Sequence, residues 1–290
     1  MRLRFLSSGV SCCVKSNSQN FRGSKSLHEI LKLIKSFRSK YYNSFLIDCF
    51  LIIQELLVAL ANIPDESIIK KSHIHVTSRT SFVISWLTML GIEPNRIIDT
   101  PVIVARELYV PEMGRCGAPF LSQLNWLNSR FVPTNDSSLS GPNQNHSSSR
   151  TTQSNSIVLI RRTRSRTVSN QGSVENTVRS FSSSLQWAFQ MHSDDRLPSL
   201  AEQLQLFLHA RIVVAPHGAG GLFINYLPPN ACVVELISKS NTCLAYSRLA
   251  YVRRIHYVQC FMNADRGNHV NEAELNAALH ACHQAVTGIV

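Results

Sequence analysis

The sequence predicts an α/β protein built from two lobes. Short apolar runs alternate with stretches of helical spacing along most of the chain, a pattern typical of sheets covered by helices. Residues 131–156 interrupt this pattern with Ser, Asn, Thr, Pro and Gly and almost no large apolar residue, which indicates a solvated linker. With 290 residues and 44% apolar content, the chain is long enough for two such lobes.

We expect the C-terminal domain to span residues 157–290 and to resemble half of a Rossmann fold. The expected strands are Ile157–Ile160, Leu185–Met191, Ile212–Ala215, Ala231–Ile237 and Ile255–Cys260. The expected helices are Val174–Phe181, Ser199–His209, one from Leu222, Cys243–Val252 and Asn271–Val286. In the second of these helices Ser199 is the predicted N-cap, since serine there can bind a backbone N–H group of the first turn.

The N-terminal lobe is expected over residues 27–130, after an unassigned segment at 1–26. Its expected elements are a helix at Asp48–Ala61, a strand at Ile74–Thr77, a helix at Ser81–Leu90 that Gly91 ends, and strands at Ile97–Asp99 and Val102–Tyr109. About a hundred residues is small for a nucleotide-binding half, so part of this lobe is expected to lie outside the chain.

The net charge and the apolar stretches of the chain indicate which classes of binding partner to expect. The formal net charge of +11 favours an anionic partner, such as nucleic acid, a membrane surface or a phosphorylated small molecule. The apolar stretch Phe45–Ala61 contains Asp48, Gln54 and Glu55 and falls short of the roughly 20 apolar residues that a membrane span needs, so it is interpreted as a core helix. We see no signal peptide, and expect membrane association only through an anchor that this sequence does not contain.

The eight cysteines include no C-x-x-C pair, which argues against a structural zinc module. Disulfides in an oxidising lumen and buried thiols both remain open. Of the two, we favour buried thiols.

A glycine-rich turn follows the apolar strand at 212–215, with the sequence Pro216-His217-Gly218-Ala219-Gly220-Gly221. Such a turn lets backbone N–H groups approach a phosphate closely, and a diphosphate is the natural ligand. The alternative is a tight connection without a ligand. The turn matches neither the dinucleotide fingerprint nor the P-loop.

A basic segment begins at the end of the domain's first strand and contains Arg161, Arg162, Arg164 and Arg166. Because ligands of parallel α/β sheets lie beyond the carboxyl ends of the strands, this segment and the glycine-rich turn are expected to open onto one crevice. Guanidinium groups there can bind phosphate oxygens and stabilise a nucleoside-diphosphate leaving group without a metal ion. A solvated basic loop is the alternative.

These residues together resemble the signature of glycosyltransferase family 61. The run from Ala210 to Asn225, followed by Pro228 and Glu235, is similar to that family's A-x-V-x-x-x-H-G-A-G-L-x-N…P…E pattern. Upstream, Arg162, Arg166 and Asn170 match its R-x-x-x-R-x-x-x-N, Leu108–Glu112 its L-x-V-P element, and Leu90–Ile98 its "lGi…ri" element. The resemblance covers about residues 40–285.

The resemblance implies an inverting glycosyltransferase with a GT-B fold of two Rossmann-like lobes. The implied donor is a nucleotide-sugar of the N-acetylglucosamine or pentose class, for which we expect UDP as the nucleotide, and the implied acceptor is a protein or a polysaccharide. No metal ion, other cofactor or nucleic acid is expected. The donor roles fall on His217, Gly218, Ala219 and Gly220 around the diphosphate, Arg162 and Arg166 as its counter-charges, Glu235 and Asn170 toward the ribose or nucleotide, and Asn225, which braces the turn or touches the nucleotide.

Inverting transfer also needs a base that takes the proton of the acceptor hydroxyl. Asp48 matches the acid of the family's Y-x-H-x-x-x-D element and is our candidate, together with His217 as a catalytic residue; the alternative for Asp48 is a helix cap or a buried partner of an arginine. Two departures bear on these assignments: Ser44 stands where the family has His, and the additional Gly221 shifts Asn225 by one position.

The sequence also bears on the compartment of the protein, and it leaves two alternatives to an active enzyme. The sequons at Asn135 and Asn145, together with the resemblance, predict the lumen of the Golgi or endoplasmic reticulum. One alternative keeps the family but makes the chain a truncated or inactive member. The other is a basic nucleic-acid-binding protein, which would leave the glycine-rich turn unexplained.

Overall fold

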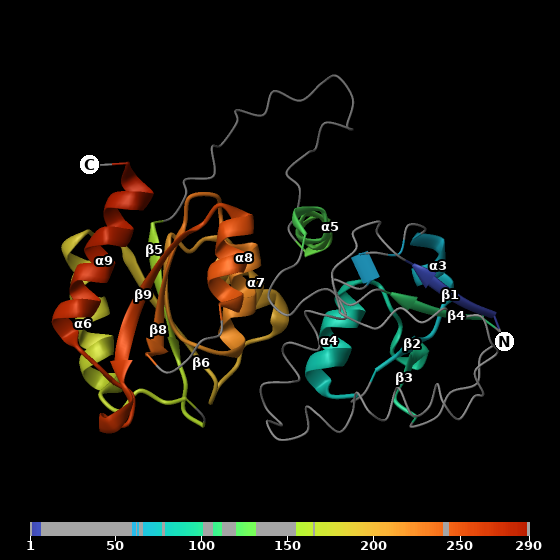
Figure 1. The fold of residues 1–290 in the computed structure, drawn as a ribbon, viewed down its shortest axis with the longest axis horizontal. Helices are drawn as coiled ribbons and strands as arrows, with labels where there is room; N and C mark the ends of the chain where they lie inside the picture. Colours follow the sequence, from blue (N-terminus) through green and yellow to red (C-terminus); the bar gives the residue numbers. More distant parts are fainter. Residues whose placement is uncertain are drawn as a thin grey trace, which may run out of the picture.

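The computed structural model describes residues 2–6, 60–61, 63, 66–76, 79–100, 107–111, 120–131, 155–164, 166–239 and 244–288. Its largest part, which we call the C-terminal unit (residues 155–288), is built on one six-stranded sheet (Figure 1). The strands are β5 (Ser156–Arg161), β6 (Ala188–Ser193), β7 (Ile212–Pro216), β8 (Cys232–Ser238), β9 (His256–Asn263) and β10 (His269–Val270).

The order of the strands in this sheet is β10-β9-β8-β7-β5-β6. Strands β5 to β9 are parallel, and β10 runs antiparallel to β9. From β5 the chain goes outward to β6 and then returns to β7 on the other side of β5, so the order reverses between β5 and β7. In doubly wound sheets the carboxyl ends of the strands at this reversal flank the ligand crevice.

Helices cover both faces of the sheet, as Figure 1 shows. One face carries α6 (Gln171–Ser184) and α9 (Glu272–Thr287), and the other carries α7 (Leu200–Leu208), the 3-10 helix η2 (Ala219–Tyr226) and α8 (Ala245–Arg253). The central strand β5 serves both cores because its side chains alternate: Ile157 and Leu159 pack under α6 and α9, and Val158 and Ile160 pack on the opposite face.

The elements of this unit follow the sequence prediction with three corrections. Ser199 caps α7 as expected and forms a capping box with Glu202. The helix expected from Leu222 is instead a 3-10 helix that begins at Ala219. The strand expected from Leu185 begins only at Ala188, because the chain turns at Leu185 and Gln186, where Gln186 has a φ of 56°. The short β10 and the 3-10 helix η3 (Ala264–Arg266) were not predicted.

The N-terminal part contains shorter elements. They are β1 (Arg2–Leu6), α3 (Glu66–Lys71), β2 (Ile74–His75), α4 (Ser81–Met89), the 3-10 helix η1 (Pro94–Arg96), β3 (Ile97–Ile98), β4 (Glu107–Pro111) and α5 (Leu121–Phe131). Strand β1, within the segment left unassigned above, pairs in parallel with β4, and β2 pairs in parallel with β3. The α/β class is therefore confirmed, and the two-lobe GT-B arrangement stays a prediction.

Several predicted features lie outside the described residues. They are Asp48 and nearly all of its helix, the sequons at Asn135 and Asn145, and residues 132–154 of the predicted linker. The ends of that linker, Phe131 and Ser156, belong to α5 and β5.

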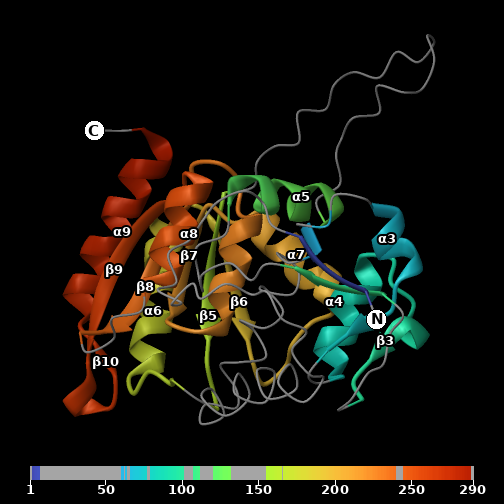
Figure 2. The same ribbon diagram turned by 45° about the vertical axis from the view of Figure 1, so that its right-hand side comes forward.

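An aromatic cluster joins the N-terminal part to the C-terminal unit. Trp86 of α4 is fully buried and packs edge-on against Phe131 of α5, with ring centroids 5.1 Å apart, and it stacks on Tyr226 at 5.9 Å. Phe223 lies against the same indole ring. Since Phe223 and Tyr226 belong to η2, the helix that starts in the glycine-rich turn is also the helix on which the N-terminal part rests. Figure 2 shows α5 above this junction.

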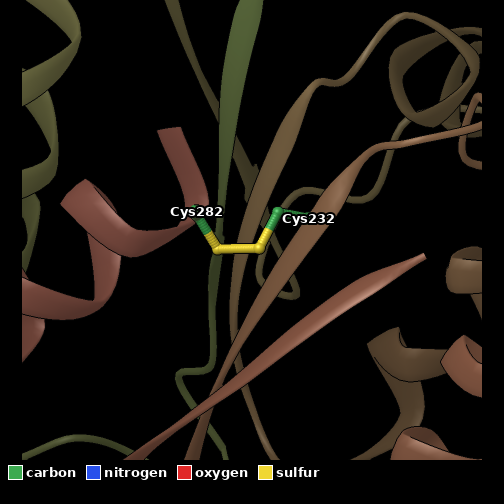
Figure 3. Close-up of a disulfide and its surroundings, with 2 residues drawn as sticks. All are labelled: Cys232 and Cys282. Carbon is green, nitrogen blue, oxygen red and sulfur yellow. A yellow bond between two sulfur atoms is a disulfide. The ribbon is translucent and has the colours of Figure 1, made fainter. Parts of the chain in front are cut away.

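Two cysteines on the α9 face form a disulfide. Cys232 at the start of β8 is bonded to Cys282 of α9 (Figure 3), while Cys260 of β9 is a buried thiol whose pKa burial raises to about 11. The preference for buried thiols is therefore wrong for Cys232 and Cys282 and confirmed for Cys260. Within the described ranges, no helix is long and apolar enough to cross a bilayer.

Candidate functional site

The basic segment after β5 and the glycine-rich turn after β7 meet at the reversal of strand order. The Arg166 guanidinium donates a hydrogen bond through Nη1 to the backbone oxygen of His217, at 3.2 Å. These two residues follow neighbouring parallel strands, which explains why they meet although 50 residues separate them in the chain. The predicted proximity of the arginines and the turn is confirmed.

Gly218 is the point at which both arginines approach the backbone. A Cβ atom on Gly218 would lie 2.6 Å from Nη1 of Arg162 and 3.2 Å from Nη1 of Arg166. Its φ of 150° also lies in a region that residues with a side chain rarely adopt. The backbone conformation therefore favours glycine here, and the absence of a side chain lets two cations lie against one turn. Like charges held this close favour an anion beside them.

Asp194, which follows β6, holds the first of the two arginines. Its Oδ2 atom pairs with Nε of Arg162 at 3.2 Å, and its Oδ1 atom accepts hydrogen bonds from the backbone N–H and the hydroxyl of Thr163, both at 2.7 Å. Burial disfavours the charged carboxylate, but the bonds from Thr163 and the charge of Arg162 outweigh it and lower the pKa of Asp194. Asp194 therefore remains an anion, and it holds the Nε end of the Arg162 guanidinium in place.

Sequence reasoning missed Asp194. The available signal was an acidic pair, Asp194-Asp195, directly after a strand that neighbours the arginine-bearing strand.

Below the turn lies a buried polar network. The Nδ1 atom of His217 and the Oε1 atom of Glu235 are 2.5 Å apart, and the Tyr257 hydroxyl donates to the other carboxylate oxygen. His217 is 8% exposed and Glu235 is 3% exposed, while the ring of Tyr246 from α8 packs edge-on against the imidazole. Glu235 is therefore connected to the turn through His217. Tyr257 was also missed, although it lies on β9 directly beside the strand that carries Glu235.

The remaining predicted residues lie at the edges of this arrangement. Ala219 and Gly220 form the start of η2. Asn225 is almost fully buried near the end of the same helix, where its amide donates to Asn128 of α5 at 3.2 Å. Asn170 precedes α6, and its amide binds the backbone of Val270.

Comparison with known proteins places the chain in a family. The family model described as glycosyltransferase 61 matches residues 26–234. The chain belongs to glycosyltransferase family 61. It is accordingly a glycosyltransferase, an enzyme that transfers a sugar from a donor to an acceptor. No curated protein matches it significantly.

Some residues of the candidate site of this family 61 enzyme lie inside the range that the family model matches, and others lie after it. Arg162, Arg166 and the His217–Gly218 turn lie inside the matched range, whereas Glu235 follows its last residue directly. Tyr257 and Val270 lie well beyond it. The residues that bring charge to the turn therefore come from the matched range, and several residues that hold them come from after it.

Proposed function

We propose that this enzyme transfers a sugar of the N-acetylglucosamine or pentose class from a UDP-sugar to a protein or polysaccharide acceptor, with inversion and without a metal ion. The observation that carries this proposal is the gathering of Arg162 and Arg166 against the His217–Gly218 turn, where the strand order reverses. The GT-B arrangement of two Rossmann-like lobes is part of the same proposal.

In this reaction the donor diphosphate would lie against the turn. The acceptor oxygen forms a bond to the anomeric carbon while the bond from that carbon to the diphosphate breaks, and the diphosphate leaves with the electron pair. Arg162 and Arg166 would neutralise the charge that develops on it, as preorganised donors do in other leaving-group sites. The backbone N–H groups at the start of η2 would add further donors. These cations supply the charge that a metal ion supplies elsewhere, so chelation by EDTA should change the rate little.

The contacts of His217 limit how it can act. Glu235 occupies Nδ1, so contact with the donor would be made through Nε2. Both carboxylate oxygens of Glu235 already have protein partners, and Asn225 binds α5. For these two residues we therefore favour support of the turn over direct contact with the ribose.

The acceptor side rests on Asp48, which we propose as the base that takes the proton of the acceptor hydroxyl. Because a base acts on the acceptor and makes no contact with the diphosphate, Asp48→Asn should leave UDP affinity nearly unchanged and reduce transfer. UDP titration and transfer assays on the same preparation measure both effects. If Asp48→Asn weakens UDP binding as much as Arg166→Ala does, the division between donor and acceptor sides is wrong.

For location we propose a lumen of the secretory pathway, where members of this family typically act. The disulfide between Cys232 and Cys282 supports an oxidising compartment, and the sequons at Asn135 and Asn145 agree with it. A tagged full-length protein that stays cytosolic and unglycosylated would contradict this.

The activity is tested with a panel of UDP-sugars. A ligand that binds only the folded protein at 100 times its Kd stabilises it by about 2.7 kcal/mol, which thermal denaturation detects readily. We expect stabilisation by UDP and by at least one UDP-sugar, with release of UDP when an acceptor is added. Binding without transfer would support an inactive member. Binding to generic RNA or DNA, with no effect of any UDP-sugar, would support the nucleic-acid alternative.

A further inference from the structure

Asn170 connects the arginine-bearing loop to a distant part of the chain. Its amide nitrogen donates to the backbone oxygen of Val270 at 2.9 Å, and its amide oxygen accepts from the backbone N–H of the same residue at 2.9 Å. The side chain thus pairs with a backbone as a strand would. Asn170 stands at the N-cap position of α6, where asparagine is common, yet its side chain makes no capping hydrogen bond. Its helix position therefore does not explain its contacts.

Two further contacts join the same loop to the same place. Ser169 donates its hydroxyl to the backbone oxygen of Arg266 at 2.9 Å, and Asn268 donates to that of Thr167 at 3.4 Å. All of these partners lie at 266–270, in the segment of β9, η3 and β10 that we call the C-terminal hairpin (residues 256–270). The hairpin lies outside the range that the family model matches.

The segment that this hairpin holds directly follows Arg166. The backbone of Arg166 is left-handed, with a φ of 55°, a conformation that costs free energy for a residue with a side chain. Such a conformation persists only where its surroundings fix it. Arg162, at the other end of the loop, has Asp194 as its partner, whereas the chain after Arg166 is held at Thr167, Ser169 and Asn170 by the hairpin.

We propose that Asn170 is a positioning residue of the donor site, which fixes Arg166 beside the His217–Gly218 turn by tying its loop to the C-terminal hairpin. This rests on the proposed function, because it assumes that Arg166 binds the donor diphosphate. It assigns the third residue of the Arg162, Arg166, Asn170 motif to the backbone of Val270 instead of to the nucleotide. A positioned group loses much of its effect when its supports are removed.

The first test compares Asn170→Ala with wild type in two measurements. Hydrogen exchange of peptides covering residues 162–170, without ligand, should be faster in the variant. UDP affinity by titration calorimetry should fall roughly 10- to 100-fold, as it does when side chains that orient metal ligands are removed. Asn170→Asp keeps the acceptor for the Val270 N–H, so its exchange rate and its UDP affinity should lie between those of Asn170→Ala and wild type. Asn176→Ala, at an exposed position of the same helix, is the control and should behave as wild type.

A double-mutant cycle with Arg166→Ala separates positioning from contact. If Asn170 acts through Arg166, removal of Asn170 in the Arg166→Ala background should weaken UDP binding no further. Full additivity, with unchanged exchange in residues 162–170, would mean that Asn170 contacts the nucleotide and would overturn the proposal. Faster exchange with unchanged UDP affinity would overturn it too. A wild-type protein that binds neither UDP nor inorganic pyrophosphate would instead overturn the donor site itself.

Discussion

The two halves of the candidate site are built on different principles. On the side of β5, Arg162 and Arg166 keep partial contact with solvent, and Arg162 is bonded to Asp194 while Arg166 is bonded to the His217 carbonyl. On the side of β7 and β8, His217 and Glu235 are buried, and their polar atoms are bonded to one another and to Tyr257.

This difference predicts different consequences of mutation. Removing a cation near solvent costs little folding stability, because water replaces its contacts. It does deprive a bound anion of its counter-charge. A buried polar group leaves unpaired partners behind when it is removed, and each costs free energy of folding. The arginine half should therefore determine donor binding, and the histidine half should determine stability as well.

The largest effect is expected for Glu235→Ala. This change leaves His217 Nδ1 and the Tyr257 hydroxyl without their buried partner, and loss of one member of a buried pair typically costs about 3–5 kcal/mol. Urea denaturation with and without the substitution measures it. Tyr257→Phe leaves the His217–Glu235 pair in place and should cost less. An unchanged urea midpoint in Glu235→Ala would mean that the network is open to water.

Arg166→Ala should show the opposite pattern. Loss of one preorganised hydrogen-bond donor that stabilises a leaving group lowers turnover roughly 10²–10³-fold, or by about 2.7–4 kcal/mol. The urea midpoint, by contrast, should hardly move. The exposed Arg164 supplies the control, since Arg164→Ala removes the same charge from the same loop. Equal losses in the two variants would show that general attraction, and not the contact at the turn, decides the rate.

Opening the disulfide should lower the stability of the protein and leave the arginine half of the site intact. Cys282→Ala opens a cross-link between residues 50 apart, which typically costs about 2–4 kcal/mol of stability. Calorimetric unfolding measures this, and UDP affinity of the folded variant should match wild type. Reducing agent should destabilise wild type by a similar amount and leave the variant unchanged; sensitivity of the variant would point to another pairing.

The smallest effect concerns pH. Because the pKa of Asp194 is lowered in the folded protein, its contribution to stability is complete above about pH 4, the ordinary Asp value, and is lost as pH falls through the lower native pKa. Asp194→Asn should therefore be less stable than wild type at pH 7, with a difference that shrinks as the pH falls below about 4. It should also weaken UDP binding through Arg162, whereas Asp195→Asn, at the exposed neighbour, should not.

Much of the fold was predictable because its signals are local. The strands at 157–160 and 212–215 are continuous apolar runs, and the strand at 231–237 is apolar except for Glu235. The structure places all three within about one residue of the prediction. Helix α5 was missed because polar residues dominate it, although Leu124, Leu127 and Phe131 follow a helical spacing on its buried side. The glycine-rich turn was recognised, but its composition does not distinguish a 3-10 from an α-helix.

The sequence predicted the charged residues and the turn of the site, but not the residues that support them. Arg162, Arg166 and His217 follow strands that the sequence marks clearly, so their meeting follows from the parallel sheet. Their supports depend on pairings that no local pattern contains: Asn170 and Val270 are 100 residues apart, and Tyr257 reaches Glu235 only through the register of β8 and β9.

The order of the strands also bears on when the site forms as the chain folds. β5 pairs with β7, although α6, β6 and α7 lie between them in the sequence, so Arg166 reaches His217 only when this long stretch of chain is closed into a loop. The hairpin that holds Asn170 and the helix that carries Cys282 come later still in the chain. Parallel pairings of this separation are slow, because the entropy of closing long loops is lost before the contacts form. The His217–Gly218 turn should therefore mature in the last kinetic phase of refolding, and recovery of the proposed UDP binding should lag behind recovery of helical signal.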